Sequence, residues 1–445
     1  MEVYYDLSRL MERAAAASPT GVDRVDLRYA LWTREQASAW VAILQRPEGL
    51  SVVDADTANH LLASLSRRWI EGARPDVGTD AICELPESWA VETKLSILEK
   101  AARVSLGERL EGRRLLDWPF YAQPKWSRRL LSLRRKPACM EGALDPQGSY
   151  WNIGHNFRFE NAAAEIATRF GGNSVIFLHD VIPLLHPETQ RAVSHRHFQR
   201  FGKWVDRLNG QLIVSSQSTI EDLNQLRERG IDLFGSQLDS MIQLPLPVEP
   251  SFAQASRART ESVKSAEPYF LILGTWEPRK NVEVLLDVWE RLVVEGGCRI
   301  LLKWVGRRGE ISRRSTARLK RLKAMGWVEE LGVVSDQGIQ GLFSGATAML
   351  FPSVAEGWGL PLAEALASGL PVIASDCPVC REVSQGLAEY RNPSDPEAWR
   401  LSVLEYAAAD SKLRLAQLER LASFRVQSWE TYFTQFAGRL NPSST

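Results

Sequence analysis

The sequence predicts an α/β protein with parallel β-sheets and more than one domain. The first observation is a βαβ unit at residues 348–375, where an apolar strand, a glycine-rich turn, a helix and another strand follow one another. The second is that short apolar strands recur on both sides of a proline-rich stretch near residues 245–267. The third is the length of 445 residues, which is enough for two or three domains with sizeable cores.

The composition narrows the classes of function. Lysine plus arginine and aspartate plus glutamate number 54 each, so the net charge is zero and nothing global points to nucleic acid. Hydrophobic residues make up 44% of the chain, as in a soluble globular protein. No apolar run reaches the ~18 residues of a membrane span, and no signal peptide opens the chain. We therefore expect a cytoplasmic protein. Five cysteines, an odd number, give no disulfide framework.

The first half opens with a predicted strand at residues 2–7. A turn near residues 18–25 follows, and Thr20 or Asp23 is the expected cap of the next helix. Residues 113–136 differ in character, because eight basic and four aromatic side chains accompany a single acid, Asp117. Such a segment could bind an anionic lipid surface or a lipid-pyrophosphate acceptor. The alternative is a basic face that is simply exposed to solvent.

Two strand ends of the first half carry histidines. Residues 150–156 contain His155, and the apolar strand at 175–178 ends in His179 and Asp180. A histidine at a strand end is more often a structural residue than a functional one, and on the residues alone this alternative stays open for both.

The second half begins after the proline-rich linker, with an apolar strand at 269–273. The turn behind it carries Arg279 and Lys280 directly before a helix predicted at 282–293. Two cations at a helix N-terminus suit a diphosphate, and a charged surface turn is the alternative. A strand at 300–306 and a basic helix at 307–323 follow, and we expect that helix to present a solvated face.

The βαβ unit carries the clearest chemistry. Gly357 and Gly359 let a ligand approach the backbone closely, and the helix predicted at 361–368 offers free N–H groups to a phosphate. We expect Glu356 and Glu364 to lie on the side of the helix and loop that faces the ligand. Carboxylates there would accept hydrogen bonds from sugar hydroxyls, and they would not bind an anion. This combination predicts a nucleotide-sugar site, and an ordinary turn with exposed glutamates is the alternative.

Two further features have simpler explanations. Cys377 and Cys380 form a CxxC pair without a second pair at zinc-site spacing, so we expect neither metal binding nor redox chemistry there. The tail at 426–440 is rich in aromatic residues and predicts a terminal helix.

These motifs resemble those of a known family. Glu356-Gly357-Trp358-Gly359-Leu360-Pro361 with Glu364 resembles the donor-site signature of the GT4 family, retaining glycosyltransferases with the GT-B fold. Only Trp358 departs from the family pattern, in which phenylalanine is usual. Residues 274–281 resemble the family's cation turn, although Thr275 stands where an arginine is usual and Arg279 lies beside Lys280. Residues 20–25 resemble bacterial members that build surface polysaccharides.

The resemblance implies roles for individual residues. The implied catalytic residues are His179, Glu356, Lys280 and Arg279. The implied donor-binding residues are Gly21, Gly274, Thr275, Val333, Val334, Gly357, Trp358, Gly359, Leu360 and Glu364. The implied acceptor contacts are His155 and Asp180, and no metal ligand is implied.

The resemblance also implies an architecture of two Rossmann-like, doubly wound domains that face each other across a cleft. Residues 1–250 would bind the acceptor, 251–267 would be the linker, 268–425 would bind the nucleotide-sugar donor, and 426–445 would cross back as a terminal helix.

The implied reaction is transfer of a hexose, with mannose as the first candidate, in polysaccharide or lipopolysaccharide assembly. GDP-mannose or a UDP-hexose would be the donor, and a glycan or a lipid-pyrophosphate-linked glycan the acceptor. No cofactor or metal would be required, and residues 113–136 would contact the anionic inner face of the cell membrane.

Three other functions differ from this one in what they require. A nucleotide-sugar 2-epimerase of the same fold would convert the donor without an acceptor. A catalytically silent partner protein would bind the nucleotide sugar and transfer nothing, although the intact glutamate pair and cation pair argue against it. A Rossmann dehydrogenase is disfavoured, because no GxGxxG motif follows a strand.

Overall fold

The computed structural model describes residues 1–14, 16, 18–72, 144–157, 159–190, 192–231, 233–255, 267–296, 299–309 and 311–440. The basic segment at 113–136 and most of the predicted linker at 251–267 lie outside these residues. The chain divides into two compact units. The first unit is Met1–Phe177 with Phe201–Gln211, and the second is Leu178–Arg200 with Leu212–Thr445. The four segments expected from the sequence, 1–250, 251–267, 268–425 and 426–445, remain a prediction.

The first sheet has seven strands in the order β3-β2-β1-β4-β5-β6-β7. Its strands are β1 (Glu2–Asp6), β2 (Ala39–Arg46), β3 (Gly49–Val52), β4 (Ser149–Asn152), β5 (Ser174–Leu178), β6 (Gln211–Val214) and β7 (Ile242–Gln243). The register places Val3 opposite Trp40 on one side and Ser149 on the other, both in parallel pairs. Only the edge strand β3 is described as antiparallel to its neighbour, β2.

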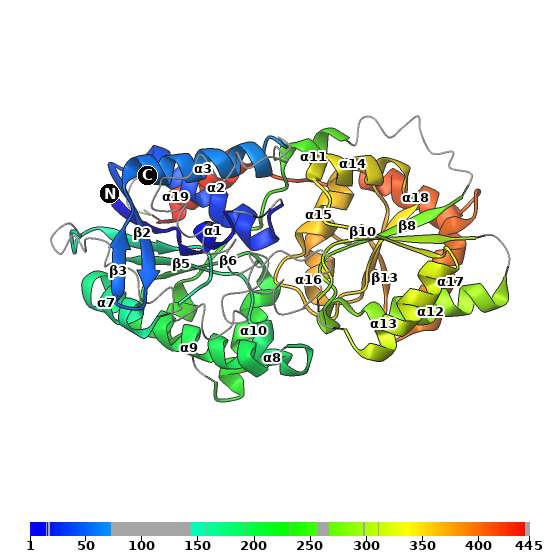
Figure 1. The fold of residues 1–445 in the computed structure, drawn as a ribbon, viewed down its shortest axis with the longest axis horizontal. Coiled ribbons are helices and arrows are strands. Elements are labelled where there is room, and N and C mark those ends of the chain that lie inside the picture. The colour runs from blue at the N-terminus through cyan, green and yellow to red at the C-terminus, as the bar shows by residue number, and fades with distance from the viewer. Residues whose placement is uncertain are drawn as a thin grey trace, which may run out of the picture. The chain divides into compact units, whose positions relative to one another are not determined.

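Helices cover both faces of this sheet within the first unit: α2 and α3 lie on one face and α7 on the other (Figure 1). The helices in this half of the chain are α1 (Ser8–Glu12), α2 (Gly21–Gln36), α3 (Ala55–Trp69), α7 (Glu160–Phe170), α8 (Ile182–Leu185), α9 (Ala192–Leu208), α10 (Gln217–Glu228) and α11 (Pro250–Ala255). Thr20 caps α2, as predicted, and its hydroxyl and the Asp23 carboxylate form a reciprocal capping box.

The second sheet has six strands in the order β10-β9-β8-β11-β12-β13, and every described pair is parallel. Its strands are β8 (Tyr269–Leu273), β9 (Leu301–Val305), β10 (Val328–Gly332), β11 (Ala348–Phe351), β12 (Val372–Ser375) and β13 (Glu389–Arg391). Taken in chain order, this is the doubly wound order 3-2-1-4-5-6. Its direction reverses between β8 and β11, and ligands of such sheets bind at that reversal.

Alternation along the strands builds two apolar layers, one on each face of the second sheet. In β8, Phe270 and Ile272 join one layer while Leu271 and Leu273 join the other, as the two-residue period of a strand requires. The helices are α12 (Val282–Glu295), α13 (Arg313–Ala324), α14 (Asp336–Gly345), α15 (Leu360–Ala367), α16 (Pro378–Val383), α17 (Pro396–Ala407), α18 (Lys412–Leu421) and α19 (Trp429–Leu440). Figure 1 shows α12, α13 and α17 on one face and α14, α15 and α18 on the other.

The terminal helix α19 follows the predicted aromatic tail. Its Trp429 indole N–H donates to the Glu249 carboxylate at 3.1 Å, and the Arg439 guanidinium donates to the carbonyl oxygen of Gln243 at 2.5 Å. Trp429, Tyr432, Phe433 and Phe436 are buried, so one face of the helix packs against residues near β7.

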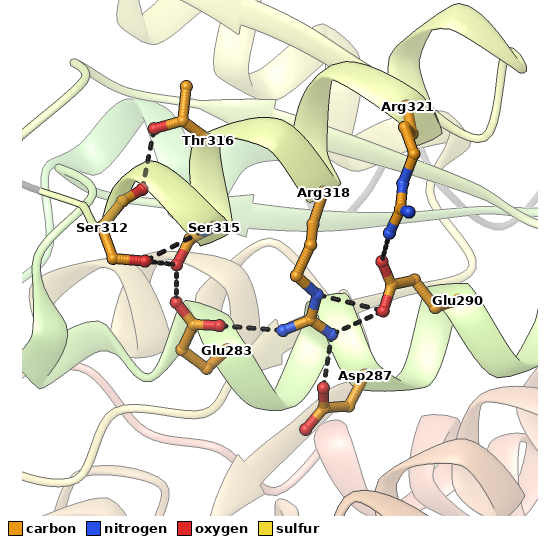
Figure 2. Close-up of polar contacts among 8 residues, drawn as sticks. All are labelled: Glu283, Asp287, Glu290, Ser312, Ser315, Thr316, Arg318 and Arg321. Atoms are coloured by element: carbon orange, nitrogen blue, oxygen red, sulfur yellow. Dashed lines mark hydrogen bonds and ion pairs between the residues drawn. The ribbon is translucent and has the colours of Figure 1, made fainter.

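The basic helix α13 does not present only a solvated face. Arg318 is buried, and it lies against an acidic row on α12 formed by Glu283, Asp287 and Glu290 (Figure 2). The row has the spacing of successive helical turns, so three carboxylates reach one guanidinium. The expectation of a solvated face is therefore wrong for Arg318, although Arg313, Arg314 and Lys320 are exposed.

Candidate functional site

The predicted donor loops follow two neighbouring strands at the reversal point of the second sheet. The cation turn comes directly after β8, and the loop with Glu356 comes directly after β11. Because β8 and β11 are parallel and paired, their carboxyl ends meet at one edge of the sheet. The topology thus brings Glu356 to the cation turn, although Lys280 and Arg279 lie 76 and 77 residues before it in the sequence.

The cation turn is held by close backbone packing. Gly274 has a φ of 142°, and a Cβ atom added to the adjacent Gly306 would lie 1.9 Å from the carbonyl oxygen of Gly274. Neither position accommodates a side chain without strain. Asn281, with a left-handed φ of 50°, ends the turn and begins α12. These constraints fix where Arg279 and Lys280 start, in a short three-ten helix at Pro278–Lys280.

Glu356 binds both cations of the turn. Arg279 donates to one of its carboxylate oxygens at 2.6 Å, and Lys280 donates to the other at 2.5 Å. Burial would raise the pKa of Glu356, but the charges of Arg279 and then Lys280 outweigh it and lower the pKa to about 2. The carboxylate is therefore ionised at neutral pH, and it accepts hydrogen bonds without donating any.

The backbone of the Glu356 loop lies against the end of β5. A Cβ atom at Gly357 would lie 2.1 Å from the carbonyl oxygen of His179 and 3.0 Å from the Cβ atom of Asp180. The structure therefore brings both predicted residues beside this loop. His179 is buried, and burial raises the pKa of Asp180 while the Arg279 charge opposes that rise.

The remaining predicted donor residues lie around α15 and α14. Gly359, with a left-handed φ of 92°, precedes α15, which begins at Leu360, one residue before the predicted start. Glu364 lies within α15 and is 5% exposed. Val333 and Val334 connect β10 to α14, and Val333 is exposed. Thr275 follows Gly274 directly in the cation turn.

Two predicted residues belong to the first unit. Gly21 is exposed and begins α2, directly behind the Thr20 cap. His155 follows β4 with a positive φ of 60°, and its ring meets the Phe201 ring edge-on at a centroid distance of 4.3 Å. Strands β1 and β4 are neighbours, so His155 lies at the reversal point of the first sheet.

Three further side chains, outside the implied set of site residues, also contact this region. Glu277 contacts Arg279 at 3.3 Å. Ser216 donates to the carbonyl oxygen of Gly357 at 2.9 Å. Glu382 accepts from the backbone N–H of Gln217 at 2.7 Å and of Ser218 at 3.1 Å. The sequence indicates a serine-capped helix here and predicts that residues 215–218 could contact the donor or the acceptor, but it does not reveal the tertiary contact with Gly357.

Metal ligands, cysteines and membrane spans can be located only in the part of the chain that the structure describes. Within it, no group of three or more histidine, cysteine or acidic side chains is placed to hold a metal ion. Cys377 and Cys380 are both free thiols. None of the described helices is long and apolar enough to cross a membrane.

Comparison with known proteins gives consistent matches. The family model described as "Glycosyl transferases group 1" matches residues 267–409. O-antigen chain mannosyltransferase B of Escherichia coli is 28% identical over 325 residues, which are 69% of this chain and 81% of that protein. O-antigen chain mannosyltransferase RfbU of Salmonella typhimurium is 33% identical over 238 residues, which are 52% of this chain and 60% of that protein.

Two solved structures match along nearly the whole chain. WaaG, a glycosyltransferase involved in lipopolysaccharide biosynthesis, superposes with a TM-score of 0.54 at 16% identity and 98% coverage of both chains. Anabaena Alr3699/HepE in complex with UDP gives a TM-score of 0.54 at 14% identity and 99% coverage of both. At such identities the likeness shows the fold, which is the predicted GT-B arrangement of two α/β sheets.

Proposed function

We propose that this chain, whose second half matches the group 1 glycosyltransferases, is a member of the GT4 family that transfers mannose from a nucleotide sugar to a growing surface polysaccharide. The observation that carries the proposal is the cluster of Arg279, Lys280 and Glu356 at the reversal point of the second sheet. The match to this family supports a hexosyltransferase with a nucleotide-sugar donor and a glycan acceptor. Mannose is the first candidate because the named curated relatives are mannosyltransferases.

The donor diphosphate would lie beside Arg279 and Lys280. Each cation already contacts Glu356, but a guanidinium carries five N–H donors and an ammonium three, so both retain donors for phosphate oxygens. The N-terminus of α15 would add backbone N–H groups to the same anion. Glu364 would accept from the ribose hydroxyls, and the backbone at Val333 and Val334 would meet the base.

The sugar would lie over the loop of Glu356, with His179 beside it. In the retaining reaction of the family, the bond from the anomeric carbon to the phosphate oxygen breaks while the acceptor oxygen bonds to that carbon on the same face. The departing phosphate oxygen would take the acceptor proton. Arg279 and Lys280 would stabilise the charge that develops on the diphosphate, which is the task that preorganised cations perform best.

If Arg279 and Lys280 stabilise the diphosphate in this way, the reaction requires no metal ion. We therefore expect transfer to survive dialysis against a chelator, with activity equal to that of untreated enzyme. Chelator-dependent loss that added magnesium restores would contradict this part of the proposal.

The acceptor side belongs to the first half of the chain. We propose that a glycan, carried on a lipid pyrophosphate, approaches His155 and Asp180, and that the basic segment at 113–136 meets the anionic membrane that holds the lipid. Nucleic acid is not a partner in this proposal, because the charges of the whole chain balance.

A thermal-shift panel of nucleotide sugars tests the donor. We expect GDP-mannose to raise the melting temperature more than GDP-glucose, UDP-glucose or UDP-galactose, since a site-specific ligand stabilises only the folded state. A larger shift with a UDP-hexose would replace mannose in the proposal. Conversion of the donor without any acceptor would indicate the epimerase reaction instead.

A further inference from the structure

We propose that Ser216 is a positioning residue of the donor site, whose hydroxyl sets the orientation of the peptide between Gly357 and Trp358. The inference rests on the proposed function, because this peptide belongs to the loop that would hold the donor sugar. Its starting point is the carbonyl oxygen of Gly357. The hydroxyl of Ser216 lies 2.9 Å from that oxygen, and those of Ser215 and Thr219 lie 3.5 Å from it.

The available hydrogens select Ser216 as the donor. Its hydroxyl oxygen accepts from the backbone N–H of Thr219 at 3.0 Å and lies 2.8 Å from the Thr219 hydroxyl. A serine hydroxyl has one proton and two lone pairs. If Thr219 supplies both donors, the lone pairs of Ser216 are filled and its proton is left for the carbonyl of Gly357. Ser216 is fully buried, which strengthens such a chain of hydrogen bonds.

The planar geometry of the peptide links this hydrogen bond to the direction of the next backbone N–H. A trans peptide is planar, and its C=O and N–H point in opposite directions; the described chain contains no cis peptide. Fixing the carbonyl of Gly357 toward Ser216 therefore aims the N–H of Trp358 away from it. That N–H belongs to the loop over which the donor sugar would lie, two residues after Glu356.

Two further contacts keep the arrangement in place. A Cβ atom at Gly357 would lie 2.1 Å from the carbonyl oxygen of His179, so the loop packs closely against this carbonyl only because residue 357 is a glycine. Glu382 accepts from the backbone N–H groups of Gln217 and Ser218, which belong to the first turn of α10. This carboxylate complements the helix dipole and holds the turn from which Ser216 reaches the loop. Without the hydroxyl, the peptide plane would be free to rotate.

The test compares Ser216→Ala with Ser411→Ala. Ser411 is a matched control, because it is also buried and also caps a helix, α18, but it has no described contact with the Glu356 loop. Both changes remove one helix cap and should lower stability similarly. Only Ser216→Ala should reduce kcat/KM, by about tenfold or more, since small displacements of positioning groups have effects of that size. Ser216→Thr, which keeps the hydroxyl, should restore activity.

Two readouts separate positioning from a general loss of structure. With GDP-mannose as the probe, Ser216→Ala should raise the donor KM while the affinity for GDP alone stays within twofold of wild type. Hydrogen exchange of the backbone amides at residues 356–360, measured without ligand, should be faster in Ser216→Ala than in Ser411→Ala.

The exchange experiment does not depend on the reaction. If wild-type protein transfers nothing from GDP-mannose, the donor assignment fails, and the exchange rates still decide the role of Ser216. Equal exchange rates at residues 356–360 in the two alanine variants would overturn the positioning role. So would unchanged kcat/KM in an active Ser216→Ala enzyme.

Discussion

Arg279 and Arg318 are both largely buried arginines held by carboxylates in the second unit, yet their surroundings differ. Arg279 lies in a turn with unusual backbone angles at Gly274 and Asn281, and its main partner, Glu356, has a side chain only 8% exposed. Arg318 lies in the regular helix α13. Its three partners on α12 have side chains that are 31–55% exposed.

We infer that the difference separates a proposed binding site from a structural contact. A left-handed backbone at a non-glycine residue and largely buried charges are costly, and proteins tolerate both mainly where function requires them. Helix-to-helix ion pairs with half-exposed acids need no such strain, and they serve to dock α13 on α12. We call Arg279, Lys280 and Glu356 the first cluster, and Arg318 with its partners on α12 the second cluster. We expect substitutions in the first cluster to reduce transfer and substitutions in the second cluster to reduce stability.

The largest expected effect is the loss of transfer in Lys280→Ala and in Glu356→Ala, each tested separately. Lys280→Ala removes a cation that would stabilise the departing diphosphate, and Glu356→Ala removes the carboxylate that orients both cations. A loss of about a hundredfold or more in kcat is expected, as for other preorganised charges. Circular dichroism should confirm that both variants are folded. Near-native turnover in either variant would refute the assignment of the first cluster.

The pH dependence of stability should come next in size. Glu356 has an ordinary pKa of 4.5 in the unfolded chain and about 2 in the folded protein. Its ionised form is therefore favoured by folding, and its contribution is present above about pH 4.5 and decreases as the pH falls toward 2. Urea unfolding of wild type and Glu356→Gln should show a stability difference at pH 7 that shrinks in acid. A difference that is constant with pH would contradict the ion pair.

The sequence predicted these two clusters with unequal success. The cation turn and the loop of Glu356 were found because glycines and charges at strand ends have local signatures, and β8 and β11 have the predicted bounds. The contact between Arg318 and α12 was not predicted, because the charge pattern of each helix, taken alone, is typical of a solvent-exposed face. Only the packing of α13 on α12 reveals that the two patterns are complementary.

The same limit applies to Ser216. A serine directly before a helix predicts an N-terminal cap, and Ser216 does cap α10. Its second contact, with the carbonyl of Gly357, depends on residues 141 positions away in the sequence. Contacts of this kind follow from tertiary packing, and no local pattern encodes them. For the same reason, the antiparallel edge strand β3 was not predicted.

Removing the guanidinium of the second cluster should cost stability and leave transfer intact. In Arg318→Met, the aliphatic part still packs, but three carboxylates lose their shared partner. Hydrogen bonds to charged groups contribute about 1.5–3 kcal/mol in total at such a site, so the melting temperature should fall by a few degrees. The turnover of the folded fraction should equal that of wild type. Lost transfer at normal stability would remove the distinction between the two clusters.

The smallest effect is expected for Glu290→Gln, which keeps the shape of the side chain and removes its charge. Glu290 contacts both Arg318 and Arg321, and its side chain is 31% exposed. Water and salt screen an ion pair of that kind. The free energy of unfolding should therefore fall by less than about 1 kcal/mol at low ionic strength, and this decrease should vanish in molar salt. Urea unfolding at both salt concentrations measures it, with Arg321→Gln as the control from the other side of the pair. A loss that persists in high salt would place Glu290 in a desolvated pair, and the second cluster would then resemble the first in its electrostatics.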